Sequence, residues 1–167
     1  MPEKRTIEKA KQDEKEGKAP TTQAGEFVRE EIEHIREGKH GARSTKQAIA
    51  IGLSKARRAG VKLPPPKEGT TSAQTRRKAE RDVETGQSNE DGVSSKRSRA
   101  TTRALEREPH EAASKEALSK QAHSAAKQRS GSSRSAAARK AARTKGAAGR
   151  SAAARKAART RASQQHD

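Results

Sequence analysis

The chain has 167 residues, of which 39 are Lys or Arg and 21 are Asp or Glu, so its formal net charge is +18. It contains one aromatic side chain and no cysteine, and only fifteen residues are Ile, Leu, Val, Met or Phe. So few large apolar side chains bury too little surface to offset the entropy of ordering the whole chain, which argues against a compact enzyme. Low hydrophobicity with high net charge is typical of disordered or conditionally folded proteins.

The excess of positive charge favours a polyanionic partner, which we expect to be nucleic acid rather than an anionic membrane surface. Without cysteine the chain has no disulfide scaffold and no thiolate metal site. Residues 1–20 lack the apolar core of a signal peptide, and the longest apolar run, at residues 48–53, is too short to span a membrane. We therefore expect a cytoplasmic protein without a transmembrane segment.

The first part of the chain is expected to be a charged, disordered arm, because residues 1–20 carry six basic and five acidic groups. Nine of the fifteen large apolar residues lie between Phe27 and Leu63, so an independent fold is expected at residues 25–66. A segment of about forty residues usually needs a partner or a staple to be stable.

The first helix of residues 25–66 is indicated by Val28, Ile32 and Ile35, which recur at the spacing of one helix face. Gly38 and Gly41 can adopt positive φ, so they are expected to end this helix and to form a turn.

The second helix is expected to begin after Ser44, which has the spacing of a capping box with Gln47. Ile49, Leu53 and Ala56 form its apolar stripe, and a glycine at position 60 followed by prolines at 64–66 ends it. The segment is therefore predicted to be a helix-turn-helix hairpin with a proline-rich end.

Residues 70–130 are predicted to form helix-prone segments that pack weakly, because their apolar stripes are thin. Residues 131–167 form a tail with a repeat: residues 134–145 read RSAAARKAARTK, and residues 150–161 read RSAAARKAARTR. Each unit is expected to form about three turns of helix when a polyanion neutralises its charge. Between Ala117 and His166 there are thirteen Lys or Arg and no Asp or Glu.

Phosphate contacts are expected from basic side chains of both the hairpin and the tail. Since helix-turn-helix modules present the start of their second helix to DNA, Arg43 and Lys46 are candidates there, and Arg57 and Arg58 are candidates in its last turn. The candidates in the tail are Arg134, Arg139, Lys140, Arg143, Lys145, Arg150, Arg155, Lys156, Arg159 and Arg161.

No catalytic residue, cofactor site or metal site is predicted, and the protein is not expected to be an enzyme. Serines are plentiful, but a nucleophile needs a base and a pocket, which this chain is not expected to build. His34 and His40 lie six residues apart, near acidic residues at 30, 31 and 37. A metal site needs three or four convergent ligands on a rigid frame, so we expect these histidines to be solvated.

Two stretches resemble known sequences. Residues 25–66, which read GEFVREEIEHIREGKHGARSTKQAIAIGLSKARRAGVKLPPP, resemble a domain of unknown function found in small basic bacterial proteins, often labelled DNA-binding. The tail is similar in composition to the Ala/Lys/Arg-rich arms of bacterial histone H1-like proteins. These resemblances imply a bacterial source and a location at the nucleoid.

The sequence thus predicts a mostly α-helical protein with no compact single core, in which a small helical hairpin carries extended, largely disordered or conditionally helical basic arms. Its expected function is nucleoid-associated, largely sequence-independent binding of duplex DNA through phosphates. A disordered stress protectant and an RNA-binding protein are the alternatives. Whether the hairpin reads DNA, dimerises or contacts another protein stays open.

Overall fold

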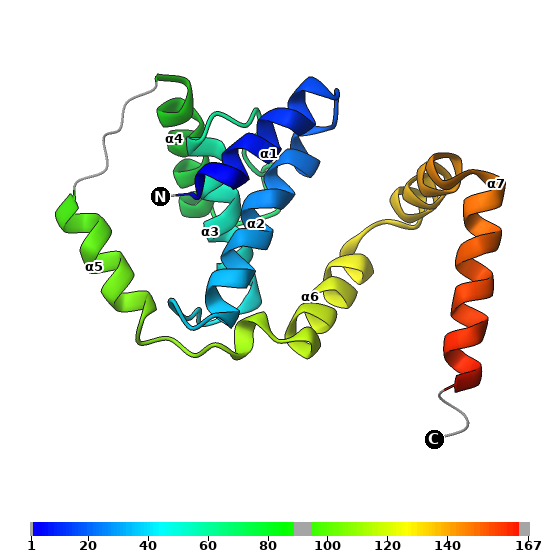
Figure 1. Ribbon diagram of the computed structural model, residues 1–167. Helices are drawn as coiled ribbons and strands as arrows, with labels where there is room; N and C mark the ends of the chain where they lie inside the picture. The colour runs from blue at the N-terminus through cyan, green and yellow to red at the C-terminus, as the bar shows by residue number, and fades with distance from the viewer. Residues whose placement is uncertain (1, 89–94, 164–167) are drawn as a thin grey trace. The chain divides into compact units, whose positions relative to one another are not determined.

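The computed structural model describes residues 2–88 and 95–163, and this part of the chain is built from helices (Figure 1). In chain order they are α1 (Lys4–Lys15), α2 (Pro20–Arg36), α3 (Thr45–Arg58), α4 (Ala73–Ser88), α5 (Ser95–Leu105), the short 3₁₀ helix η1 (Glu111–Ala113), α6 (Lys115–Gln128) and α7 (Gly131–Ser163). The prediction of a mostly α-helical chain is confirmed. The chain divides into two compact units, Met1–Gln121 and Ala122–Asp167.

The hairpin is formed by α2 and α3, which pack on each other through small residues. Gly52 lies so close to α2 that a Cβ atom there would be 2.7 Å from the Cα of Val28. Ala48 and Ala56 are fully buried at the same four-residue spacing. The buried face of α3 is therefore small, and Leu53 of the expected stripe lies beside it, half-buried.

Helices α1, α2 and α3 are each followed by a glycine with positive φ. These glycines are Gly17 (φ 69°), Gly38 (φ 74°) and Gly60 (φ 88°). After each helix, two successive N–H groups bond back to carbonyls of the last turn; the N–H of Lys39, for example, donates to the carbonyl of His34 at 3.0 Å. The predicted helix ends at Gly38 and Gly60 are confirmed, whereas Gly41, the second glycine expected to adopt positive φ, does not have it.

The start of α3 has the predicted cap. Ser44 Oγ accepts a hydrogen bond from the N–H of Gln47 at 3.2 Å. The Gln47 side chain accepts in return from the N–H of Arg43 at 2.9 Å, one residue earlier than in a standard capping box.

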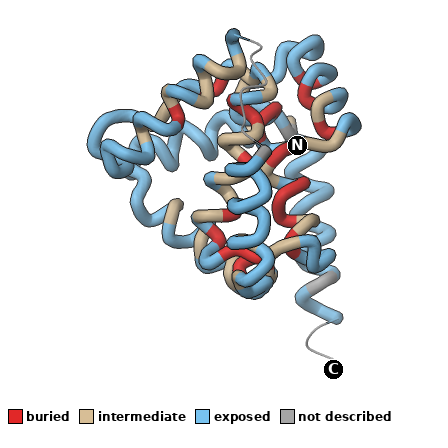
Figure 2. Tube along the Cα trace, turned by 90° about the vertical axis from the view of Figure 1, so that its left-hand side faces the viewer, coloured by how far each residue is buried: buried red, intermediate tan, exposed pale blue. Residues whose placement is uncertain are grey.

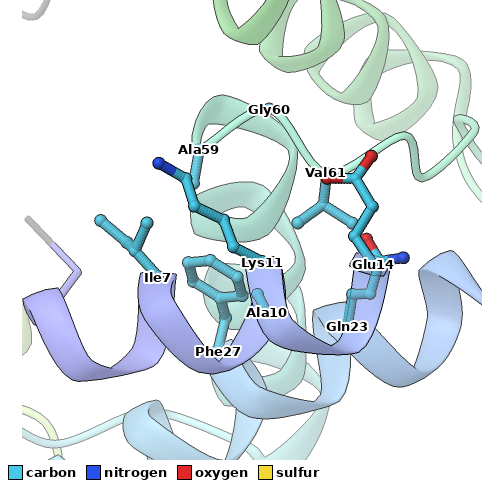
Figure 3. Close-up of a pocket in the computed structure, with 9 residues that line it drawn as sticks. All are labelled: Ile7, Ala10, Lys11, Glu14, Gln23, Phe27, Ala59, Gly60 and Val61. Atoms are coloured by element: carbon cyan, nitrogen blue, oxygen red, sulfur yellow. The ribbon is translucent and has the colours of Figure 1, made fainter. Parts of the chain in front are cut away.

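Residues 1–20 are not a disordered arm, and that expectation is wrong. Ala10 of α1 is buried in one cluster with Phe27 of α2 and Ala56 of α3, and Ile7 packs against the same cluster. A pocket of about 190 Å³ lies at this junction, and Figure 3 shows that residues of α1, of α2 and of the turn directly after α3 line it. The first helix thus covers one side of the hairpin.

The segment after the hairpin also packs against it. Ala79 of α4 is buried, and Ser54 Oγ of α3 donates a hydrogen bond to Asp82 Oδ2 of α4 at 2.7 Å. A Cβ atom on Gly86 would lie 2.1 Å from the carbonyl oxygen of Arg57, so the end of α4 touches the backbone of α3.

The 3₁₀ helix η1 covers the turn between α2 and α3. Ala112 and Ala113 join a buried cluster with Ile35. Thr45 Oγ1 donates to the carbonyl of Ala112 at 2.7 Å, and Arg36 Nε donates to the carbonyl of Ala113 at 2.9 Å. The two contacts join residues that are 67 and 77 positions apart in the sequence.

The expectation that the chain lacks a compact core is also wrong, and the reason is alanine. Eight of the twelve buried hydrophobic residues in the described part are alanines (buried residues are red in Figure 2). A count of large side chains misses them, yet alanine lets helices approach closely enough for their backbones to share dispersion contacts. The described part of the tail is helical as well. It forms α7 (Gly131–Ser163), whereas an extended arm was expected.

Candidate nucleic-acid interface

Both copies of the repeat lie on α7, and their described basic side chains are exposed. In each copy three basic side chains lie within about 100° of the helix circumference, because successive residues are about 100° apart. We call these groups the basic triads: the first is Arg139, Lys140 and Arg143, and the second is Arg155, Lys156 and Arg159. The sequence has no acidic residue between Ala117 and His166.

Helix α7 is broken between the two triads. Gly146 has φ 65° and ψ 177°, which is not helical. In an unbroken helix a shift of sixteen residues turns a side chain by about 160°, so the triads would face nearly opposite directions. Because the helix is interrupted at Gly146, the two triads are not held on opposite faces of a single straight helix.

The first arginine of each copy bonds to the end of the preceding helix. Arg134 Nη1 donates to the carbonyls of Arg129 at 3.3 Å and Ala126 at 3.5 Å. Arg150 Nη1 donates to the carbonyl of Ala142 at 2.6 Å. Terminal carbonyls of a helix lack partners within the helix, so these bonds stabilise its end.

Two further tail candidates complete the set. Arg161 is exposed near the end of α7. The side chain of Lys145 lies outside the part of the chain that the structure describes.

At the start of α3, Arg43 and Lys46 are exposed, but the two residues between them already make contacts within the protein. Ser44 caps the helix, and Thr45 is buried against η1. The edge that a helix-turn-helix module would present to DNA is therefore partly covered by residues 105–113, whose carbonyls also accept from the N–H groups of Gly41 and Ala42.

Arg57 and Arg58 have different surroundings. Arg58 is exposed, whereas Arg57 is only 7% exposed and donates from Nε to the carbonyl of Leu63 and from Nη2 to that of Pro64, both at 3.3 Å. Burial lowers the pKa of the Arg57 guanidinium, and the nearby carboxylate of Asp82 opposes this effect. Arg57 thus holds the chain after α3, and we leave it out of the interface.

The basic side chains of the hairpin do not form one patch. Lys46 and Arg58 are twelve residues apart on α3, which corresponds to about 18 Å along the helix axis. The basic triads of α7, in contrast, place three charges within little more than one helical turn.

The expectation that His34 and His40 are solvated is wrong. Their side chains are 14% and 13% exposed, and both lie beside Glu31, which is completely buried. One ligand atom from each of these three residues lies within 4.8 Å of the other two. The sequence shows the pair of histidines, but the position of His40 beside Glu31 depends on tertiary contacts of the turn, such as the bond from the Gly41 N–H to the carbonyl of Leu105.

Comparison with known proteins gives a limited result. Residues 3–67 match the model of a family of unknown function, DUF6496. The match covers α1, α2 and α3, so it includes the predicted resemblance at residues 25–66 and extends it to the first helix. No curated protein and no solved structure matches the chain.

No helix in the described part of the chain is both long and apolar enough to cross a membrane.

Proposed function

We propose that this protein is a nucleoid-associated protein of the bacterial cytoplasm that binds duplex DNA through the basic triads of α7, largely without regard to sequence. The observation that carries the proposal is the pair of identical, exposed triads in a segment without acidic residues. A group of three cations within little more than one helical turn attracts a polyanion more strongly than the surface of α1, where acidic and basic residues are mixed.

The form of the triads favours a regular phosphate backbone. Two identical units suit a ligand that presents the same phosphate groups all along its length, and phosphate contacts carry no sequence information. The tail contains no aromatic residue on which unpaired bases could stack, so a duplex is favoured over single-stranded nucleic acid. Duplex RNA shares the phosphate chemistry and serves as a comparison ligand in the test.

The break at Gly146 adds a second support. Because the two halves of α7 are separated by a non-helical residue, both triads can contact the same duplex. The arginines at the start of each repeat, Arg134 and Arg150, donate hydrogen bonds to backbone carbonyls, so the basic triads remain the groups offered to this ligand.

The test is a salt titration of duplex binding by the full-length protein on two unrelated sequences. The logarithm of the affinity falls with the logarithm of the salt concentration with a slope of about −0.9 for each phosphate neutralised. Six triad residues should therefore give a slope of about −5, and a loss of about a thousandfold in affinity between 50 and 200 mM salt.

A variant with Arg139→Gln, Lys140→Gln and Arg143→Gln should lose about three units of this slope. The matched control removes three exposed bases of α1, at Lys9, Lys11 and Lys15, and changes the net charge equally. We expect the control to keep most of the slope. Equal losses in both variants would mean that only net charge matters, and a strong preference for one duplex sequence or for RNA would contradict the proposal.

A further inference from the structure

The core of the first unit contains two buried carboxylates that share one ammonium group. Glu31 Oε2 accepts from Lys55 Nζ at 2.6 Å, and Glu30 Oε1 lies 3.7 Å from the same nitrogen. Glu31 is completely buried, and its Oε1 has no hydrogen-bond partner in the described part of the chain. Buried carboxylates are stable when each is paired, and here two of them share a single ammonium group, so the site favours a second cation.

His40 faces the unpaired oxygen. Its Nδ1 lies 3.1 Å from the carbonyl of Gly41, and since a carbonyl only accepts, the ring must donate from Nδ1. In the neutral ring Nε2 then carries a lone pair, and it lies 3.5 Å from Glu31 Oε1. Two acceptors facing each other in a buried site call for a positive ion between them or a proton on the ring.

His34 brings a second imidazole to the same place. It follows Glu31 by three residues on α2, so both side chains lie on one face of the helix. The two rings have centroids 6.1 Å apart and are almost perpendicular. Glu3 Oε1 lies 3.0 Å from His34 Nε2, which is the kind of outer carboxylate that orients a metal-binding histidine.

We propose that Glu31, His34 and His40 bind a divalent transition-metal ion of the zinc type. Two imidazoles and one carboxylate are ligands that zinc takes, with water in the fourth position. The ligand atoms, within 4.8 Å of one another, must move together to about 3.3 Å to surround an ion with bonds of 2.0–2.1 Å. Rotation of the half-buried imidazole rings supplies this movement while Lys55 stays on the other oxygen of Glu31.

The ion would connect α2 to the turn before α3 and neutralise the buried acid. Charged groups around it are Glu30 and Lys55 on the inner side, and Glu3 with Lys39 and Arg5 on the outer side. The site lies in the first unit and is independent of the basic triads. Its test needs no nucleic acid, so it can fail or succeed separately from the proposed function.

The first experiment uses the unmodified full-length protein and ZnCl₂. The imidazole signals of the histidines are followed by NMR during the titration. We expect one equivalent of zinc to shift the signals of His34 and His40 and to leave those of His110 and His123 unchanged. Saturation should occur at one ion per chain, and the midpoint of thermal unfolding should rise with zinc, because only the folded chain brings the ligands together.

The second experiment compares His40→Gln with His123→Gln, which removes an exposed histidine of α6. We expect the first variant to bind zinc at least tenfold more weakly and the control to bind as the wild type does, with the same circular dichroism in all three. If His40→Gln fails to fold, the wild-type NMR titration still decides. Equal shifts of all histidines, or equal losses in both variants, would overturn the proposal and leave Lys55 as the cation on Glu31.

Discussion

Arg150 reaches back across the break in α7, and its Nη1 donates to the carbonyl of Ala142 at 2.6 Å. Arg134, at the same position of the preceding copy, points to the carbonyl of Ala126, also eight residues earlier. The first arginine of each repeat therefore stabilises the end of the helix before it. The repeat is a structural unit with its own connection to the preceding helix as well as a cluster of charges.

The break itself can be tested with Gly146→Ala. A residue with a Cβ atom strongly disfavours φ 65° with ψ 177°, so alanine should favour one continuous helix over the repeats. We expect a larger helical signal in circular dichroism. We also expect a salt slope near that of a single triad, because the two triads would then lie about 160° apart.

Gly149→Ala is the control for this variant. It raises helix propensity by the same amount, about 1 kcal/mol, but lies in a helical part of α7. If Gly149→Ala flattens the salt slope as much as Gly146→Ala does, the break has no role in binding.

A second prediction concerns the contact between α2 and α3. Gly52→Val should lower the free energy of unfolding by about 1–3 kcal/mol or more, because the new Cβ would lie 2.7 Å from the backbone of Val28. Urea unfolding of the full-length protein measures it. Ala50→Val places the same side chain on the exposed side of α3 and should cost less than 1 kcal/mol. Similar costs for the two variants would contradict the close packing.

The helix ends could be predicted from the sequence because their signals are local. Gly38 and Gly60 end α2 and α3 through positive φ, and Ser44 starts α3 through its own side chain. Each of these depends on residues within one turn, so one sequence is enough to recognise them.

The core could not be predicted, because it depends on contacts between distant segments. Ala10 and Ala112 are buried only where α1 and η1 meet the hairpin, and nothing in their local sequence shows that they will. The same holds for Arg57, which resembles a phosphate-binding residue until the chain beyond it folds back and offers two carbonyls. The burial of His40 also follows from tertiary packing and not from its spacing to His34.

A third prediction tests the contact between Thr45 and η1. Thr45→Val keeps the shape of the side chain but leaves the buried carbonyl of Ala112 without its donor. We expect a loss of about 1–3 kcal/mol in the free energy of unfolding and faster amide exchange at residues 110–114. Thr21→Val, at an exposed position of α2, is the control, and an equal loss there would show that the hydroxyl at position 45 contributes nothing specific.

The last prediction concerns acid stability at the junction of α1 and α2. The pKa of the Glu3 carboxyl is lowered from 4.5 to about 2 by its hydrogen bond with His34, and the positive charges of Arg5 and Lys39 contribute, while partial burial opposes them. Because the pKa in the folded state lies below that in the unfolded state, the contribution of Glu3 to stability is complete above pH 4.5 and is lost as the pH falls toward 2.

Glu3→Gln should therefore be less stable than the wild type at neutral pH, and the difference should shrink as the pH falls from 4.5 to about 2. Urea unfolding at a series of pH values measures this difference. Glu8→Gln, which removes a carboxylate from the exposed side of α1, serves as the control and should show a smaller difference. A difference between Glu3→Gln and the wild type that stays constant over this range would show that the side chain acts through its shape. In that case the hydrogen bond with His34 and the ion pairs with Arg5 and Lys39 would not contribute to stability.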